Sequence, residues 1–129
     1  MTTDFVMLPR RATAAKALAW IRRERPEQHM MTYLYIVDPE ERLVGVVSLR
    51  DLVLAGPDDE MEAIMEDDLV EVTAEVDEEE VGRIMTKYDL LAIPVVGEGR
   101  RLLGIVTLDD ALEAVVPDEW KHRLPRLYR

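Results

Sequence analysis

The stretch Gly45-Val46-Val47-Ser48-Leu49-Arg50-Asp51-Leu52 recurs later in the chain as Gly104-Ile105-Val106-Thr107-Leu108-Asp109-Asp110-Ala111. Each copy has a glycine, two β-branched residues, a hydroxyl residue and an acid three places further on. β-Branched residues favour a strand, and a Ser or Thr followed by such an acid is a start signal for a helix. Each copy therefore predicts a short buried strand that runs directly into a helix, with the hydroxyl at the corner.

The rest of the chain repeats around these two corners. Residues 1–6 (MTTDFV) align with residues 65–70 (MEDDLV), and residues 42–48 (RLVGVVS) align with residues 101–107 (RLLGIVT). We therefore divide the chain into a first repeat at residues 1–56, a second repeat at 57–116 and a basic tail at 117–129. So short a unit buries too little apolar surface to be stable alone, and we expect the two repeats to pack together.

Hydrophobic periodicity and turn residues predict the same order of elements in both repeats. In the first repeat they indicate an extended entry at 5–8, a helix at 13–25, strands at 32–37 and 43–47, and a helix at 49–54. In the second they indicate an entry at 69–73, a helix that begins after Asp77, strands at 91–96 and 102–106, and a helix at 108–116. The expected fold class is α/β (α+β): two β-α-β-β-α repeats packed sheet to sheet around a pseudo-two-fold axis.

Pro94 stands inside the strand expected at residues 91–96. Proline has no N–H to donate, so within sheets it is confined to edge strands, strand starts and bulges. We therefore expect this strand to lie at an edge of its sheet or to contain a local bulge.

The charge of the chain argues against one class of partner. The formal net charge is -11, and residues 58–80 hold thirteen acids and no Lys or Arg. Because binding to nucleic acid needs basic side chains that neutralise phosphates, we expect no nucleic-acid partner. The acidic stretch is either a solvated face or a surface that attracts divalent cations or a basic partner.

Several kinds of chemistry are also disfavoured. The chain has no cysteine, which removes disulfides and thiolate chemistry and is typical of a cytoplasmic protein. No apolar run approaches the roughly 20 residues that cross a bilayer, so we expect no membrane insertion of this segment. Ser48 has no general base beside it in sequence, and His29 and His122 lack partners at ligand spacing and are expected at the surface. We therefore expect a protein that is not an enzyme.

Two copies of β-α-β-β-α, each ending in Gly-h-h-[Ser/Thr]-x-x-Asp (h is apolar), resemble the tandem CBS domains of a Bateman module. The resemblance covers residues 1 to about 116. Within it, residues 33–38, 42–52, 88–96 and 104–110 look most like the cytosolic CBS region of MgtE-type magnesium transporters.

The resemblance implies a function. In MgtE-type transporters the CBS pair is a cytosolic regulatory part that dimerises, binds Mg2+ at acidic surfaces and, in some members, binds ATP or a related adenine nucleotide. A chain of this kind is expected to form a homodimer, to sense Mg2+ or ATP, ADP or AMP, and to gate a membrane transporter domain in cis or in trans. The alternatives are a stand-alone adenine-nucleotide sensor that regulates another enzyme or transporter, and a purely structural dimerisation module.

The two corners, Ser48 with Asp51 and Thr107 with Asp110, have two interpretations. In the first, the hydroxyl and the acid form a capping box that satisfies free N–H groups in the first helical turn, and its loss costs about 1 kcal/mol. In the second, the free N–H groups bind phosphate and the acid accepts the hydroxyls of a ribose. The resemblance favours the second interpretation, because CBS pairs commonly hold adenosine ligands with this hydroxyl and this acid.

The corners differ in the residue before the acid, which is Arg50 in the first and Asp109 in the second. A cation in the first turn of a helix is unfavourable unless an anion meets it, whereas two adjacent acids repel phosphate. We therefore predict that the first corner is the better nucleotide site and that the second is empty or holds a cation. By resemblance, Tyr33 stacks on the adenine, and Val70 and Leu90 line its pocket.

Three acids match positions that resemble Mg2+-associated acids in MgtE-type repeats: Asp77, Asp89 and Asp110. Mg2+ keeps several waters and is usually bound through one or two carboxylates at a time. Each acid also has a structural interpretation, because Asp77 and Asp110 cap helices and Asp89 ends one. Both interpretations stay open on the sequence alone.

Overall fold

The chain folds into two similar halves. The computed structural model describes residues 1–115, so the predicted tail at 117–129 lies outside the described residues. The first half contains β1 (Val6–Pro9), α1 (Ala14–Glu24), α2 (Gln28–Met31), β2 (Tyr33–Val37), β3 (Leu43–Ser48), α3 (Leu49–Leu54) and α4 (Met61–Ile64). The second half contains β4 (Val72–Thr73), α5 (Glu78–Lys87), β5 (Ala92–Val96), the 3-10 turn η1 (Glu98–Arg100), β6 (Leu102–Thr107) and α6 (Leu108–Val115).

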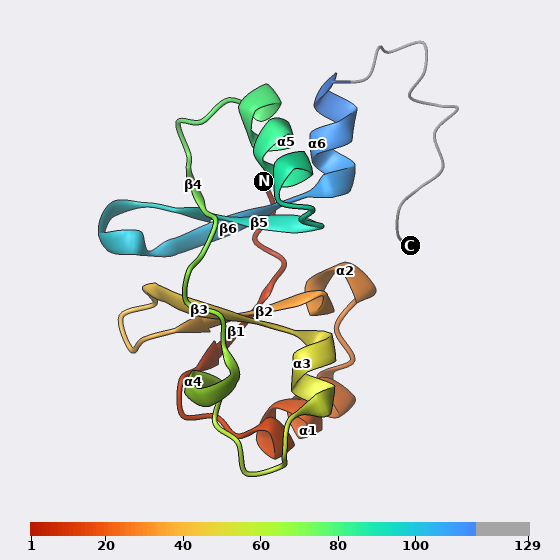
Figure 1. The fold of residues 1–129 in the computed structure, drawn as a ribbon, viewed down its shortest axis with the longest axis vertical. Coiled ribbons are helices and arrows are strands. Elements are labelled where there is room, and N and C mark those ends of the chain that lie inside the picture. The colour runs from red at the N-terminus through yellow and green to blue at the C-terminus, as the bar shows by residue number, and fades with distance from the viewer. Residues whose placement is uncertain (116–129) are drawn as a thin grey trace.

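Each half has a three-stranded sheet, of order β1-β2-β3 in the first and β4-β5-β6 in the second. In both sheets the first strand runs parallel to the second, and the second and third form an antiparallel hairpin. The two sheets face each other, with α1, α3 and α4 outside the first sheet and α5 and α6 outside the second (Figure 1). This arrangement confirms the predicted repeats and their sheet-to-sheet packing.

Apolar side chains form three layers. Alternate residues of a strand point to opposite faces, and in β2 both faces are buried. Leu34 and Ile36 pack with the helices outside the first sheet, whereas Tyr35 and Val37 pack between the sheets against residues such as Ile105. A third layer lies between the second sheet and its helices. Continuous burial of the central strands explains why they read as unbroken apolar runs.

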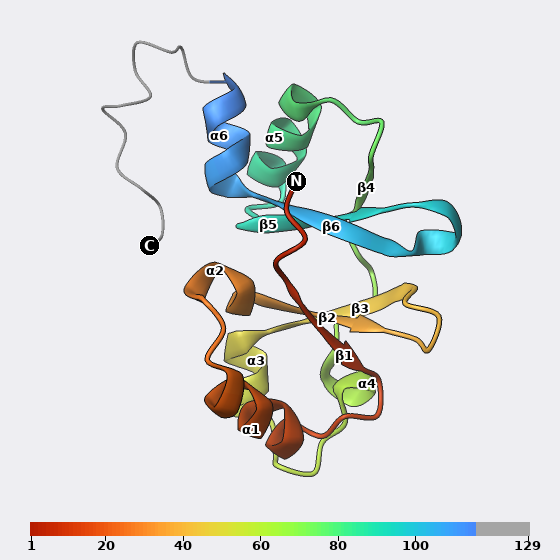
Figure 2. The ribbon, with the colours of Figure 1, turned by 180° about the vertical axis from the view of Figure 1, so that it is seen from behind.

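The segment before each first strand crosses to the other sheet. Thr2 and Ile105 exchange two backbone hydrogen bonds of 2.8 and 2.9 Å, and Glu66 and Val46 exchange an equivalent pair of 2.9 and 3.0 Å. Figure 2 shows the first crossing, from β6 to β1, and Figure 1 shows the second, which passes β3 on its way to β4. The aligned residues 1–6 and 65–70 therefore do the same structural task, and each ties one repeat to the other.

The glycine that opens each repeated stretch lies beneath a crossing segment. A Cβ atom at Gly104 would lie 2.7 Å from the carbonyl oxygen of Thr2, and one at Gly45 would lie 2.7 Å from Cγ of Met65. Met1 stands over Gly104 as Met65 stands over Gly45. The two glycines are thus explained by the close approach of the partner repeat.

Of the two alternatives predicted for Pro94, an edge strand or a local bulge, the edge position is wrong, because β5 is the middle strand of its sheet. The missing N–H is tolerated for two reasons. β4 pairs only with Val95 and Val96, and Ile105, which lies opposite Pro94, uses its own N–H and C=O to bind Thr2. The expected irregularity does occur beside the proline, as a register shift between Val95 and Val96.

Two short helices, α2 and α4, are absent from the sequence-based expectation. Helices of four residues carry no usable periodicity, so local patterns do not predict them. α4 follows residue 56, where the sequence divides the repeats, yet it packs on the first half. Met61 is fully buried in that core, and its N–H donates to the carbonyl oxygen of Ala12 at 2.8 Å.

Among residues 1–115, no helix is long and apolar enough to cross a bilayer.

Candidate functional site

The three residues predicted to surround an adenine come together in one hollow of about 140 Å³. Tyr33 comes from the start of β2, Val70 from the segment before β4, and Leu90 from the segment between α5 and β5. The hollow lies between the two repeats, and its remaining walls are Tyr35, Val46, Glu66, Asp68, Leu69, Ala92 and Pro94. Its lining is mainly apolar, and its two acids, Glu66 and Asp68, belong to the segment that crosses from β3 to β4. An apolar hollow with a few polar groups suits a flat ring that carries polar atoms at its edge.

Tyr33 is held in place across the repeat boundary. Its hydroxyl oxygen accepts a hydrogen bond of 3.4 Å from the backbone N–H of Leu91. The half-buried ring borders the hollow, so one of its surfaces is available to an aromatic ligand.

Tyr35 contributes a buried polar atom that the sequence-based prediction missed. Its ring packs edge-on against Phe5, with centroids 6.1 Å apart. Its hydroxyl is buried and has no hydrogen-bond partner among the described residues. Burial, and then the nearby Tyr33, raise the pKa of this phenol well above its usual range, so the group stays protonated. A buried, unsatisfied hydroxyl beside a hollow is a group that a bound molecule can satisfy. Alternation along β2 could have identified it, because residues 33 and 35 share a face.

The first corner lies beside Tyr33, because Ser48 is the residue paired with Tyr33 in the β2–β3 register. Ser48 Oγ accepts a hydrogen bond of 3.1 Å from the N–H of Asp51, so the first half of the predicted capping box is present. The Asp51 carboxylate lies 3.7 Å from the Arg50 guanidinium, and these side chains are 55% and 81% exposed. The acid and the base at this corner are therefore both accessible to solvent.

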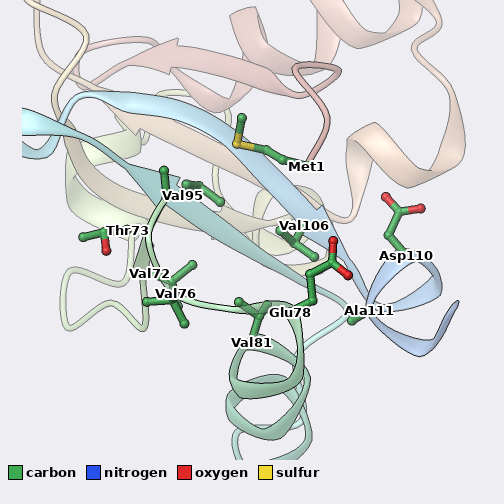
Figure 3. A pocket seen from close by; sticks show the side chains of 11 residues that line it. Met1, Val72, Thr73, Val76, Glu78, Val81, Val95, Val106, Asp110 and Ala111 are labelled. Atoms are coloured by element: carbon green, nitrogen blue, oxygen red, sulfur yellow. The ribbon is translucent and has the colours of Figure 1, made fainter. Parts of the chain in front are cut away.

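The second corner is built differently. Thr107 is buried, its Oγ1 accepts a hydrogen bond of 3.4 Å from the N–H of Asp110, and it pairs with Ala92 where the first corner has Tyr33. Thr107 and Asp109 line a hollow of about 100 Å³. Asp110 instead lines a separate hollow on the outer face of the second sheet (Figure 3). Thr107 and Asp110 are therefore joined at one helix start, as the sequence spacing predicted, and each also borders a different hollow.

The three acids predicted to bind Mg2+ lie at separate places. Asp77 is the N-cap of α5 and accepts a hydrogen bond of 2.9 Å from the N–H of Glu80. Asp89 follows α5 with a positive φ of 54°, and Asp110 lies in the first turn of α6. All three are exposed. Within residues 1–115, no three side chains of the Asp, Glu, His or Cys type converge as a metal-binding group. Each acid can therefore supply one carboxylate to a hydrated ion, which is the form of binding that Mg2+ tolerates.

His29 is not the surface residue that its sequence context suggests. Its side chain is only 15% exposed, and Nδ1 lies 3.5 Å from the Glu27 carboxylate. It lines the hollow at the second corner. The cause is α2, which the sequence patterns did not predict and which carries His29 toward the second repeat. His122 lies outside the described residues.

Comparison with known proteins places these features in a family context. A family model described as the CBS domain matches the chain twice, at residues 1–58 and 61–117. Magnesium transporter MgtE of Thermus thermophilus is 42% identical over 115 residues, which are 89% of this chain and 26% of that protein. MgtE of Bacillus subtilis is 37% identical over 116 residues, which are 90% of this chain and 26% of that protein. The chain therefore spans about a quarter of the length of these curated relatives.

A solved structure gives the same result in three dimensions. The cytosolic domain of the Mg2+ channel MgtE in complex with ATP superposes with a TM-score of 0.84 at 42% identity, over 89% of this chain and 46% of that one. The fold class and the resemblance to the CBS region of MgtE-type transporters are thereby confirmed.

Proposed function

Because this chain belongs to the family of CBS-domain proteins, we propose that it is a non-catalytic regulatory module that binds an adenine nucleotide in the hollow at Tyr33. The observation that carries the proposal is the convergence of Tyr33, Val70 and Leu90, which are far apart in sequence, in one hollow. Tyr33 pairs with Ser48, the N-cap of the helix whose first turn carries Arg50 and Asp51, although these two side chains do not line the hollow. That a related cytosolic domain, of the channel MgtE, has been solved with ATP supports it.

Each part of the nucleotide has a matching group at this site. The adenine stacks on the Tyr33 ring, with Val70 and Leu90 on the other walls, because aromatic and apolar side chains favour a flat ring. The Asp51 carboxylate accepts hydrogen bonds from the ribose hydroxyls. The Arg50 guanidinium meets the phosphates, which explains a cation in the first turn of α3.

The second corner is the weaker nucleotide site in this proposal. Ala92 stands where the first corner has Tyr33, so this position supplies no ring for stacking. Asp109 replaces Arg50, and an acid repels phosphate.

Calorimetric titration of ATP tests the proposal. Asp51→Ala should weaken ATP affinity by about tenfold or more, since hydrogen bonds to a charged group are worth about 1.5–3 kcal/mol. The matched control is Asp110→Ala, which removes the equivalent acid of the second corner and should leave the affinity unchanged. An affinity that is the same in wild type and Asp51→Ala, or that falls equally in both variants, contradicts the assignment.

We further propose that the module senses Mg2+ and acts as the cytoplasmic regulatory part of a homodimeric MgtE-type transporter, in cis or in trans. The strong excess of acids supports this, because facing carboxylates repel one another until cations lie between them. Asp77, Asp89 and Asp110 are the candidate ligands. The mechanism is thermodynamic linkage. Mg2+ binding favours the closed packing of the modules, and a transporter state that favours the closed packing strengthens Mg2+ binding by the same factor.

A further inference from the structure

Tyr35 borders the hollow proposed for the adenine and carries a hydroxyl group that the proposed function does not use. The residue is only 1% exposed, and its hydroxyl has no hydrogen-bond partner within residues 1–115. Burying a hydroxyl without a hydrogen bond costs free energy, so such groups are rare unless a bound molecule or a water satisfies them. The group therefore calls for a partner that enters the hollow.

The two repeats place different residues on the faces that meet at this hollow. Tyr33 and Tyr35 lie two positions apart in β2 and share the face of the first sheet that meets the second sheet. The registers of the two hairpins make Ala92 and Pro94 of β5 their equivalents. All four residues line the hollow. The first repeat thus presents two phenol rings where the second presents a methyl group and a proline ring.

This difference explains both the open space and the unpartnered hydroxyl. Alanine and proline side chains are smaller than tyrosine and carry no polar atom, and proline also has no N–H to donate. Phe5, whose ring packs edge-on against Tyr35, adds only apolar surface. The acids Glu66 and Asp68 line the hollow too, but neither bonds to the Tyr35 hydroxyl.

We propose that the Tyr35 hydroxyl recognises the edge of the bound base by donating a hydrogen bond to a ring nitrogen of the adenine. This inference rests on the proposed function, because it assigns a further contact within the same site. Adenine has acceptor nitrogens at N1, N3 and N7, whose lone pairs lie in the plane of the ring. Tyr33 then supports the face of the base, and Tyr35 recognises its edge.

The phenol of Tyr35 is held in the form that can donate. Burial, and then the nearby Tyr33, raise the pKa of Tyr35 well above its usual range, so the hydroxyl keeps its proton at neutral pH. A carboxylate only accepts hydrogen bonds, so Glu66 and Asp68 cannot make this contact in its place. A base with C–H at the contacted position leaves the buried hydroxyl unsatisfied, which makes the contact selective.

Calorimetric titration of ATP and its analogues tests the contact. Tyr35→Phe removes only the hydroxyl and should weaken ATP affinity by about two- to tenfold. Among the three ATP analogues in which C–H replaces N1, N3 or N7, one should show a similar loss with the wild type. That analogue should lose nothing further with Tyr35→Phe, because the hydrogen bond is already absent.

Thermal melts without ligand separate recognition from a structural role. A hydroxyl that is unsatisfied in the free protein contributes no stability, so the Tm of Tyr35→Phe should equal or exceed that of the wild type. The matched control is Tyr88→Phe, which removes the same atom from a tyrosine that is 50% exposed. It should change neither the ATP affinity nor the Tm.

Equal ATP affinity of wild type and Tyr35→Phe overturns this inference and leaves the proposed function standing. A Tm of Tyr35→Phe below that of wild type also overturns it, since the hydroxyl then has a partner, such as a water, in the free protein. Losses that add for all three analogues show that no ring nitrogen is the acceptor, with the same consequence. If the wild type does not bind ATP, the proposed function itself fails and this inference fails with it.

Discussion

The hydroxyl of Tyr33 in the first repeat accepts a hydrogen bond of 3.4 Å from the backbone N–H of Leu91 in the second. The bond spans 58 residues of sequence and lies beside the hollow that also contains Leu90 and Val70. The candidate nucleotide site therefore exists only when the two repeats are packed together. A ligand bound there contacts both repeats, so it stabilises their packing as well as each half.

Replacement of Tyr33 separates ring stacking from the hydroxyl contact. Tyr33→Ala should weaken ATP affinity by about tenfold or more, because base–aromatic stacking is worth about 1–3 kcal/mol. Tyr33→Phe keeps the ring and should bind ATP within about threefold of wild type, since the exposed Leu91 N–H can bind water instead. Calorimetry measures both. Equal losses in the two variants would mean that the hydroxyl, not the ring, recognises the ligand.

Alanine at the two corner glycines should destabilise the fold to different extents. At Gly104 the added methyl group meets the backbone oxygen of Thr2, which cannot move without breaking the bonds to Ile105, so we expect a loss of about 1–3 kcal/mol. At Gly45 it meets the flexible side chain of Met65, and the loss should be smaller. Urea unfolding gives both values.

A double-mutant cycle checks the cause at Gly45. Met65→Ala removes the side chain that the new methyl group meets, so the loss from Gly45→Ala should shrink in the Met65→Ala background. Strictly additive losses would show that the two residues do not interact, and would contradict the crossing contact.

Asp38 should make the fold acid-sensitive. It is buried, and its pKa is held below the usual range by the backbone N–H of Arg42, then by the Arg42 guanidinium at 2.8 Å and the N–H of Glu40. A lowered folded pKa means that the charged form contributes stability above the unfolded pKa, which is lost as the pH falls through the folded pKa.

The test is Asp38→Asn, compared with wild type in thermal melts from neutral to acid pH. The variant should melt lower at neutral pH and approach wild type at acid pH, where wild-type Asp38 is itself protonated. Asp58→Asn, in the exposed turn before α4, is the matched control and should follow wild type throughout. A constant difference between Asp38→Asn and wild type at every pH would contradict this role.

Millimolar MgCl2 should raise the Tm and the dimer fraction more than NaCl of equal ionic strength. Binding to the native state at tenfold excess over Kd stabilises by about 1.4 kcal/mol. Asp77→Ser combined with Asp89→Asn and Asp110→Asn should lose most of this gain. Serine keeps the N-cap of α5, and asparagine tolerates the positive φ at position 89. An Mg2+ response that is identical in wild type and the triple variant would remove these acids as ligands.

Local patterns determined the order of the strands and longer helices and the equivalence of the repeats, but not the four-residue helices α2 and α4. Apolar period, turn residues and hydroxyl–acid spacing act over a few neighbouring residues, so the strand-to-helix corners at Ser48 and Thr107 could be predicted directly. The asymmetry between Arg50 and Asp109 was visible for the same reason. The grouping of Tyr33, Val70 and Leu90 came from a family resemblance, since nothing in their spacing brings them together.

Only the tertiary structure decided what lies against each corner. The partners of Gly45 and Gly104 are crossing segments of the opposite repeat. The hollows that border Thr107 and Asp110 are likewise completed by residues distant in sequence, His29 at Thr107 and Met1 at Asp110. The middle position of Pro94 depends on a strand as short as β4. These are long-range contacts set by the packing of two sheets, and a sequence records each residue but not the distant surface that it meets.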